Sequence, residues 1–167
     1  LMKMLLCCHI RQLIEMKPQY DMPQIKSVNN TLLIPEISRL VDEGRPVTLT
    51  VNGRSMRPFI EHGRDKVVLV RAELVRSGDV VLADTVEKSY VLHRVIEVEN
   101  GVCVLRGDGN LDVEHCKLCN VLAKVSVVIR KRHKYDVNGL IWRAYSFLWT
   151  NLLPVRRYLL ALYRISL

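Results

Sequence analysis

The chain has 167 residues, of which 49% are hydrophobic, and a formal net charge of +8. This length and apolar share fit about one globular domain and exclude a wholly disordered chain. The cysteines number five, and an odd count argues against a framework of disulfides. No apolar run reaches the ~20 residues of a membrane-spanning helix, and no signal peptide is predicted.

The N-terminal quarter of the sequence predicts one ordered element. We expect residues 1–30 to be disordered or wrongly assigned to the chain, because the first residue is leucine and several methionines follow. A helix is predicted from Pro35 to Glu43, since proline suits the first helical position and Gly44 suits the stop. This helix is expected to belong to a peptidase-like β domain that covers residues 31–132.

The middle of the sequence, residues 46–131, is rich in β-branched residues and is divided by glycines. Short strands without long helices between them predict a mainly β fold, with a coiled antiparallel sheet or small barrel. The predicted strands cover residues 47–51, 66–71, 79–83, 90–98, 102–106 and 121–130.

The C-terminal segment, residues 133–167, changes to a helical period and is predicted to form an amphipathic helical tail. Residues 130–167 carry eight Lys or Arg against one Asp, which is most of the net charge. Arginine together with Trp and Tyr is typical of a helix at a membrane surface. We therefore expect residues 139–167 to bind an anionic membrane surface, to pack on the β domain, or to do both with different faces. No nucleic-acid partner is expected.

Three residues of the types that perform acyl transfer occur in order along the β domain. Ser55 lies in a Gly-x-Ser-Met-x-Pro turn that would hold its hydroxyl fixed and exposed, His93 lies in a predicted strand, and Asp108 lies in a Gly-Asp-Gly-Asn turn. Serine needs a neighbouring base to act as a nucleophile. Each residue alone is more often structural, but the three together predict a hydrolase.

These motifs resemble the ordered boxes of type I signal peptidases and their LexA-like relatives. The boxes are the turn around Ser55, Gly-Asp-Val-Val from Gly78, His-Arg-Val from His93 and Gly-Asp-Gly-Asn from Gly107, within about residues 47–128. The resemblance implies a coiled-sheet fold and a serine endopeptidase that cleaves a leader peptide, a signal peptide or another protein precursor. It is closest to small, unanchored bacterial members of the superfamily.

By this resemblance, Ser55 is the nucleophile, His93 is the general base, and Asp108 is the aspartate of the family's Gly-Asp box. The sequence leaves open whether Asp108, Asp112 or Glu114 orients the imidazole.

The oxyanion site and substrate groove are expected around Gly53, Met56 and Pro58. Many signal peptidases carry a small hydroxyl residue where this chain has Gly53. Oxyanion stabilisation would then depend on backbone N–H groups, including that of Ser55.

Neither a metal nor a cofactor is predicted. Cys116 and Cys119 form one Cys-x-x-Cys pair, but no second pair follows at zinc-site spacing. The expected partner is a peptide or protein substrate, and the expected location is peripheral to a membrane or otherwise cytoplasmic.

Two other functions stay open. A non-catalytic module of the same fold would use the groove to hold an extended peptide, and Gly53 favours this alternative. A self-cleaving repressor is less favoured, because no helix-turn-helix pattern precedes the β domain and no Ala-Gly or Cys-Gly pair is present.

Overall fold

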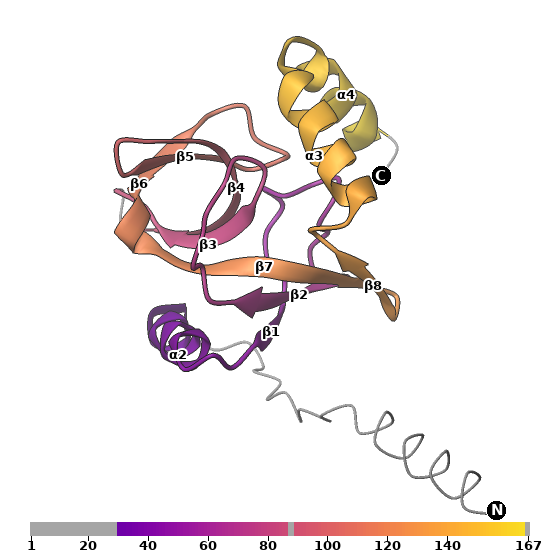
Figure 1. Cartoon of the computed structure of the whole chain (residues 1–167). Helices are drawn as coiled ribbons and strands as arrows, with labels where there is room; N and C mark the ends of the chain where they lie inside the picture. The colour runs from indigo at the N-terminus through magenta and orange to yellow at the C-terminus, as the bar shows by residue number, and fades with distance from the viewer. Residues whose placement is uncertain (1–29, 87–88, 166–167) are drawn as a thin grey trace, which may run out of the picture.

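The computed structural model describes residues 30–86 and 89–165. Within these ranges, eight strands form one antiparallel sheet that three α-helices flank (Figure 1). The elements are α2 (Asn30–Asp42), β1 (Val47–Thr50), β2 (Asp65–Val70), β3 (Val80–Asp84), β4 (Tyr90–Glu99), β5 (Val102–Arg106), β6 (Glu114–Lys117), η1 (Leu118–Asn120), β7 (Val121–Arg130), β8 (His133–Asp136), α3 (Leu140–Asn151) and α4 (Leu153–Ile165).

The sheet has the order β1-β2-β7-β3-β4-β5-β6, and β8 pairs with β7. In Figure 1, strands β3 to β6 curl around into a ring beside the flatter β1, β2 and β7. The backbone N–H of Val86, just after β3, donates a hydrogen bond of 3.2 Å to the carbonyl of His115 in β6. This bond draws the two ends of the ring together. The expectation of a mainly β fold is confirmed.

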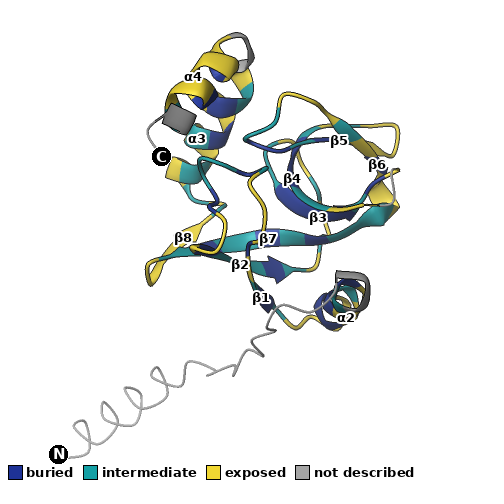
Figure 2. Ribbon diagram, turned by 180° about the vertical axis from the view of Figure 1, so that it is seen from behind, coloured by how far each residue is buried: buried dark blue, intermediate teal, exposed yellow. Residues whose placement is uncertain are grey.

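Two apolar clusters lie on the two sides of this curled sheet, and Figure 2 shows the buried residues along β2, β7, β3 and β4. The larger cluster lies where α2 packs on β1, β2 and β7, and Ile37 and Val41 give α2 its buried face. The smaller cluster fills the ring. Its buried members are Val81, Ala83, Val95, Cys103, Leu105 and Cys116.

The two C-terminal helices have one face on the β domain and one face exposed. Trp149 in α3 is buried, and its indole N–H donates to the carbonyl of Asp108 at 3.1 Å. The exposed face is strongly apolar, and its large side chains are Leu140, Ile141, Phe147, Leu148, Leu152, Val155, Tyr158, Leu159 and Leu162. The tail therefore does pack on the β domain. Among the described residues, no helix combines the length and the hydropathy that crossing a membrane requires.

The structure departs from the sequence prediction in one helix and two strands. Helix α2 begins at Asn30, so Pro35 lies inside it rather than at its first position. Strands β6 and β8 were not predicted, because their sequences are polar and lack apolar alternation. As β8 belongs to the sheet, the segment 133–167 is not helical throughout. The expectation for residues 1–29 lies outside the described residues.

Candidate active site

Ser55 lies in the turn between β1 and β2, and buried apolar side chains anchor this turn. Met56 is 2% exposed and Ile60 is fully buried, and both belong to the larger apolar cluster. The backbone N–H of Ile60 donates to the carbonyl of Met56 at 3.0 Å. Met56 was expected at the substrate groove, but its side chain lies in the core instead. Pro58 is half-buried and Gly53 is exposed.

The far end of the same turn is fixed by the buried carboxylate of Asp65. It accepts hydrogen bonds from Arg64 (2.9 Å to each oxygen), from Arg130 (3.2 and 3.0 Å) and from the backbone N–H of Glu61 (2.9 Å). Burial raises the pKa of Asp65, but these donors outweigh burial and hold it at about 2. Arg130 also donates to the carbonyl of Phe59. The carboxylate therefore ties the Ser55 turn to β7.

The turn from Gly107 to Asn110 packs directly against the backbone of Ser55. The N–H of Gly109 donates to the Ser55 carbonyl at 2.7 Å. A Cβ atom at Gly107 would lie 2.5 Å from the same carbonyl oxygen, which is closer than real contacts allow. Glycine at position 107 is therefore required for the two turns to meet.

His93 lies in β4 opposite Val81 and is 3% exposed. Its Nδ1 lies 3.2 Å from Oε2 of Glu114 in β6, although neither atom has a hydrogen bond of good geometry. Burial lowers the pKa of His93 below its usual value, and the nearby Glu114 carboxylate offsets this only in part. The imidazole is therefore neutral near pH 7, which is the form a general base needs.

The Ser55 turn and His93 lie at the same end of the sheet. Arg94 of β4 lies opposite Arg106 of β5 in the antiparallel register. One residue back along β4 and one residue forward along the chain from β5, His93 therefore lies opposite Gly107. Side chains directly opposite each other point to one face of a sheet. The Ser55 carbonyl lies where a Gly107 side chain would point, so the turn covers the face that carries the imidazole.

The contact between the two side chains themselves is not made. Within the part of the chain that the structure describes, the Ser55 hydroxyl and His93 share no hydrogen bond, and the Ser55 backbone N–H has no acceptor. Catalytic hydrogen bonds are often long in an unliganded site and tighten when substrate binds. The free N–H is a donor of the kind an oxyanion site uses.

Asp108 faces Arg94 rather than His93. Both of its oxygens accept hydrogen bonds from the Arg94 guanidinium, at 2.8 and 2.7 Å, and both side chains are fully buried. Arg94 also donates to the carbonyl of Gly78 at 2.8 Å and to the hydroxyl of Ser146 at 2.6 Å. Of the three acids that the sequence left open, Glu114 is the one in contact with the imidazole, and Asp112 is exposed.

Arg94 was missed by the sequence reasoning, although its position directly after His93 was a usable signal. Successive residues of a strand point to opposite faces, so an arginine there must lie on the other side from the base. In this fold that side is covered by α3, and a charge buried under a helix needs a carboxylate partner.

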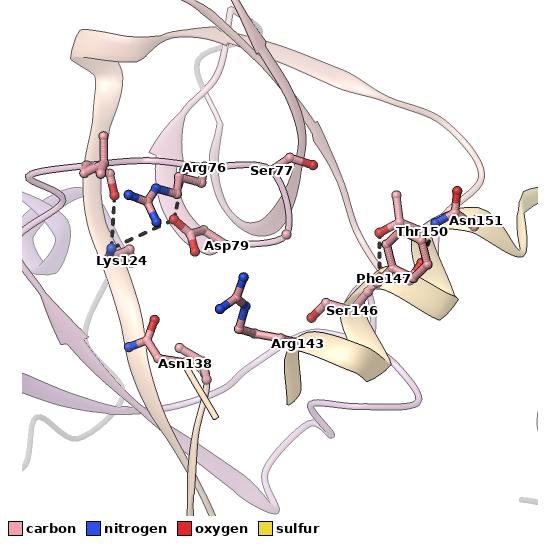
Figure 3. A pocket seen from close by; sticks show the side chains of 13 residues that line it. Arg76, Ser77, Asp79, Lys124, Asn138, Arg143, Ser146, Phe147, Thr150 and Asn151 are labelled. Carbon is pink, nitrogen blue, oxygen red and sulfur yellow. Dashed lines mark hydrogen bonds and ion pairs between the residues drawn. The ribbon is translucent and has the colours of Figure 1, made fainter. Parts of the chain in front are cut away.

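A cavity of about 580 Å³ lies between the start of β3, β7 and α3, on the far side of Arg94 from Asp108. Figure 3 shows Arg143 pointing into it from α3, while Arg76, Asp79 and Lys124 lie on the opposite wall. Neither Ser55 nor His93 lines this cavity. It is therefore separate from the candidate active site.

Comparison with models of protein families, with curated proteins and with solved structures gave no match. Among the described residues, no group of three or more His, Cys, Asp or Glu side chains is placed to hold a metal ion. Strand alternation separates His115, which is exposed, from the buried Cys116.

Proposed function

We propose that this chain is a serine endopeptidase of the signal-peptidase type, with the coiled-sheet fold of that superfamily. The observation that carries the proposal is the meeting of three segments from distant parts of the sequence. The Ser55 turn packs on the turn at Gly107, and that turn lies beside a buried, neutral His93 that has Glu114 on its Nδ1 side. A serine, a base and a group that orients the base are the parts that acyl transfer requires.

In the proposed reaction, His93 takes the proton from the Ser55 hydroxyl as the oxygen attacks the carbonyl carbon of the substrate. Because Nδ1 lies against Glu114, Nε2 is the nitrogen that accepts this proton. The backbone N–H of Ser55 donates to the oxyanion. The imidazolium then protonates the leaving amine, and water releases the acyl group from Ser55 with His93 again as the base.

The proposed substrate is a leader segment, signal segment or protein precursor that binds near a membrane. The same two helices that carry the exposed apolar face also carry Arg143 and Arg157, and both are exposed. Apolar side chains together with cations match the interior and the anionic headgroups of a lipid surface. This surface would attach the protein peripherally, close to its substrates.

A non-catalytic peptide-binding module is the second candidate. It is favoured by the missing hydrogen bond between Ser55 and His93, and by Gly53 in place of a hydroxyl donor. Both candidates would hold an extended peptide beside the Ser55 turn, so peptide binding alone does not distinguish them.

Cleavage of a peptide mixture tests the proposal. The full chain is incubated with synthetic N-terminal segments of bacterial precursors, and mass spectrometry identifies new peptide ends. We expect ends produced by the wild type and lost by about 10³-fold or more in Ser55→Ala and in His93→Ala, which act as one unit. Ser77→Ala is the matched control, because Ser77 is exposed and lies outside the site. Unchanged cleavage by Ser55→Ala would refute the nucleophile. Binding without cleavage by the wild type would favour the second candidate.

A further inference from the structure

Two arginines under the C-terminal helices have buried nitrogen atoms that contact no acceptor. Nε and Nη1 of Arg106 in β5, and Nε and Nη1 of Arg156 in α4, are buried without a hydrogen-bond partner. The hydroxyl of Tyr145 in α3 is also buried without a hydrogen-bond partner. Arg156 is 1% exposed, so bulk water does not solvate it. Unpaired buried donors are rare and call for an explanation, since each costs free energy.

These donors gather around Asp108. Arg106 pairs with Arg94 across β4 and β5, so both arginines point to the face that α3 covers. The Arg156 guanidinium lies 5.0 Å above the Trp149 ring and donates to the Trp149 carbonyl at 2.8 Å. The indole N–H of Trp149 in turn donates to the Asp108 carbonyl. Burial lowers the pKa of Arg156, the nearby charge of Asp108 raises it, and the charge of Arg106 lowers it.

The charges in this cluster do not balance. Arg94, Arg106 and Arg156 bring three positive charges, and Asp108 brings one negative charge that Arg94 uses with both oxygens. Across the described ranges, Arg106 and Arg156 form no ion pair. A buried charge without a partner is strongly unfavourable. The surplus of donors and of positive charge has the character of a site for an anion.

We propose that Arg106 and Arg156, with the Tyr145 hydroxyl, form a binding site for a phosphate group, either free phosphate or the headgroup of an anionic phospholipid. A phosphate offers several acceptor oxygens and up to two negative charges, which match the free donors and the excess charge. A neighbouring cavity of about 310 Å³ is lined by Arg157 and Leu160 of α4 and by the turn from Gly109 to Asp112. The site joins α4 to the β domain, and it does not depend on the proposed peptidase activity.

Thermal unfolding of the full chain in increasing phosphate tests the site. Chloride replaces phosphate at constant ionic strength, so that general screening does not contribute. We expect a saturable rise in Tm for the wild type. Arg106→Gln should need about 10- to 100-fold more phosphate for the same rise, because it loses charge-assisted hydrogen bonds. Arg71→Gln is the matched control, since Arg71 is exposed and outside the site.

Arg106 is the residue to change first, because it is only half-buried, whereas Arg156 is 1% exposed. Arg106→Lys keeps the charge and should retain part of the effect. A short-chain, soluble phosphatidic acid then replaces phosphate in the same experiment. The ligand that gives half of the maximal rise in Tm at the lower concentration identifies the source of the bound phosphate group. Either ligand must lose its effect in Arg106→Gln. If the wild type shows no saturable rise with either ligand, or if Arg106→Gln responds like the wild type, the site does not exist.

Discussion

Among the residues that the structure describes, two aspartates are buried, one on each side of the Ser55 turn, and their surroundings differ. Asp65 meets Arg64 and Arg130, whose side chains are 36% and 33% exposed, so water still solvates both cations. Asp108 meets Arg94, which is fully buried, and two further arginines lie near with unpaired nitrogens. Both aspartates fix the backbone that presents Ser55.

The difference shows how to separate a structural ion cluster from a binding site. Around Asp65 every carboxylate oxygen is used, and the cations keep access to water, so the cluster is complete by itself. Around Asp108 the carboxylate is also fully used, but Nε and Nη1 of both Arg106 and Arg156 have neither acceptor nor solvent. An incomplete cluster of this kind points to a ligand.

Removing Asp108 should cause the largest loss of stability. Asp108→Ala leaves Arg94 buried without a partner and adds to the unbalanced charge, so we expect a loss of about 3–5 kcal/mol in the free energy of unfolding. Urea unfolding measures it. The double change Arg94→Met with Asp108→Leu should recover much of the loss, since the buried Arg94 charge is removed together with its partner. A loss below about 1 kcal/mol in the single variant would mean that water reaches Arg94.

Removing the charge of Asp65 should have a smaller effect with a defined pH dependence. The folded pKa of about 2 lies below the usual value of 3.8, so the ionised carboxylate stabilises the fold by about 2 kcal/mol above pH ~4. This contribution is lost as the pH falls through 3.8 towards 2. Urea midpoints of the wild type and Asp65→Asn should therefore converge over that interval. A difference between the two urea midpoints that stays constant down to pH 2 would contradict the lowered pKa of Asp65.

The sequence predicted the parts of the fold that depend on local pattern. Alternating β-branched residues located six strands, but β8, with the sequence His-Lys-Tyr-Asp, forms only because β7 offers an edge. For the site, Ser55 and His93 were named from their motifs, and the structure brings their segments together. The sequence signalled a buried Arg94 but not which acid pairs with it, because that depends on which face of β4 the tail helices cover.

Glu114 completes the comparison, as an acid that is only partly buried and faces a base instead of an arginine. If the proposed function holds, Glu114→Gln should lower kcat by more than about tenfold, because the imidazole loses the group that orients it. Loss of the carboxylate also lowers the pKa of His93 further, so the rising limb of the pH profile moves to lower pH. Asp112→Asn is the matched control.

An NMR titration of the His93 ring gives a readout that does not need activity. The ring should titrate at lower pH in Glu114→Gln than in the wild type, and Asp112→Asn should leave it unchanged. Equal effects of the two variants on kcat and on the titration would exclude a specific role for Glu114.

The smallest effect on stability is expected on the outer face of the tail, whose inner face covers the Asp108 cluster. Phe147 and Leu148 are 70% and 60% exposed, so changing both to serine should alter the free energy of unfolding by at most about 0.5 kcal/mol. If this face binds lipid, the same double variant should lose affinity for anionic vesicles by tenfold or more, because each side chain would bury apolar area in the bilayer. Co-sedimentation at low and high salt measures binding, and Trp149→Ala, on the inner face, should lose stability instead. A wild type that stays in the supernatant at low salt, or a double variant that binds equally well, would show that the outer face does not contact lipid.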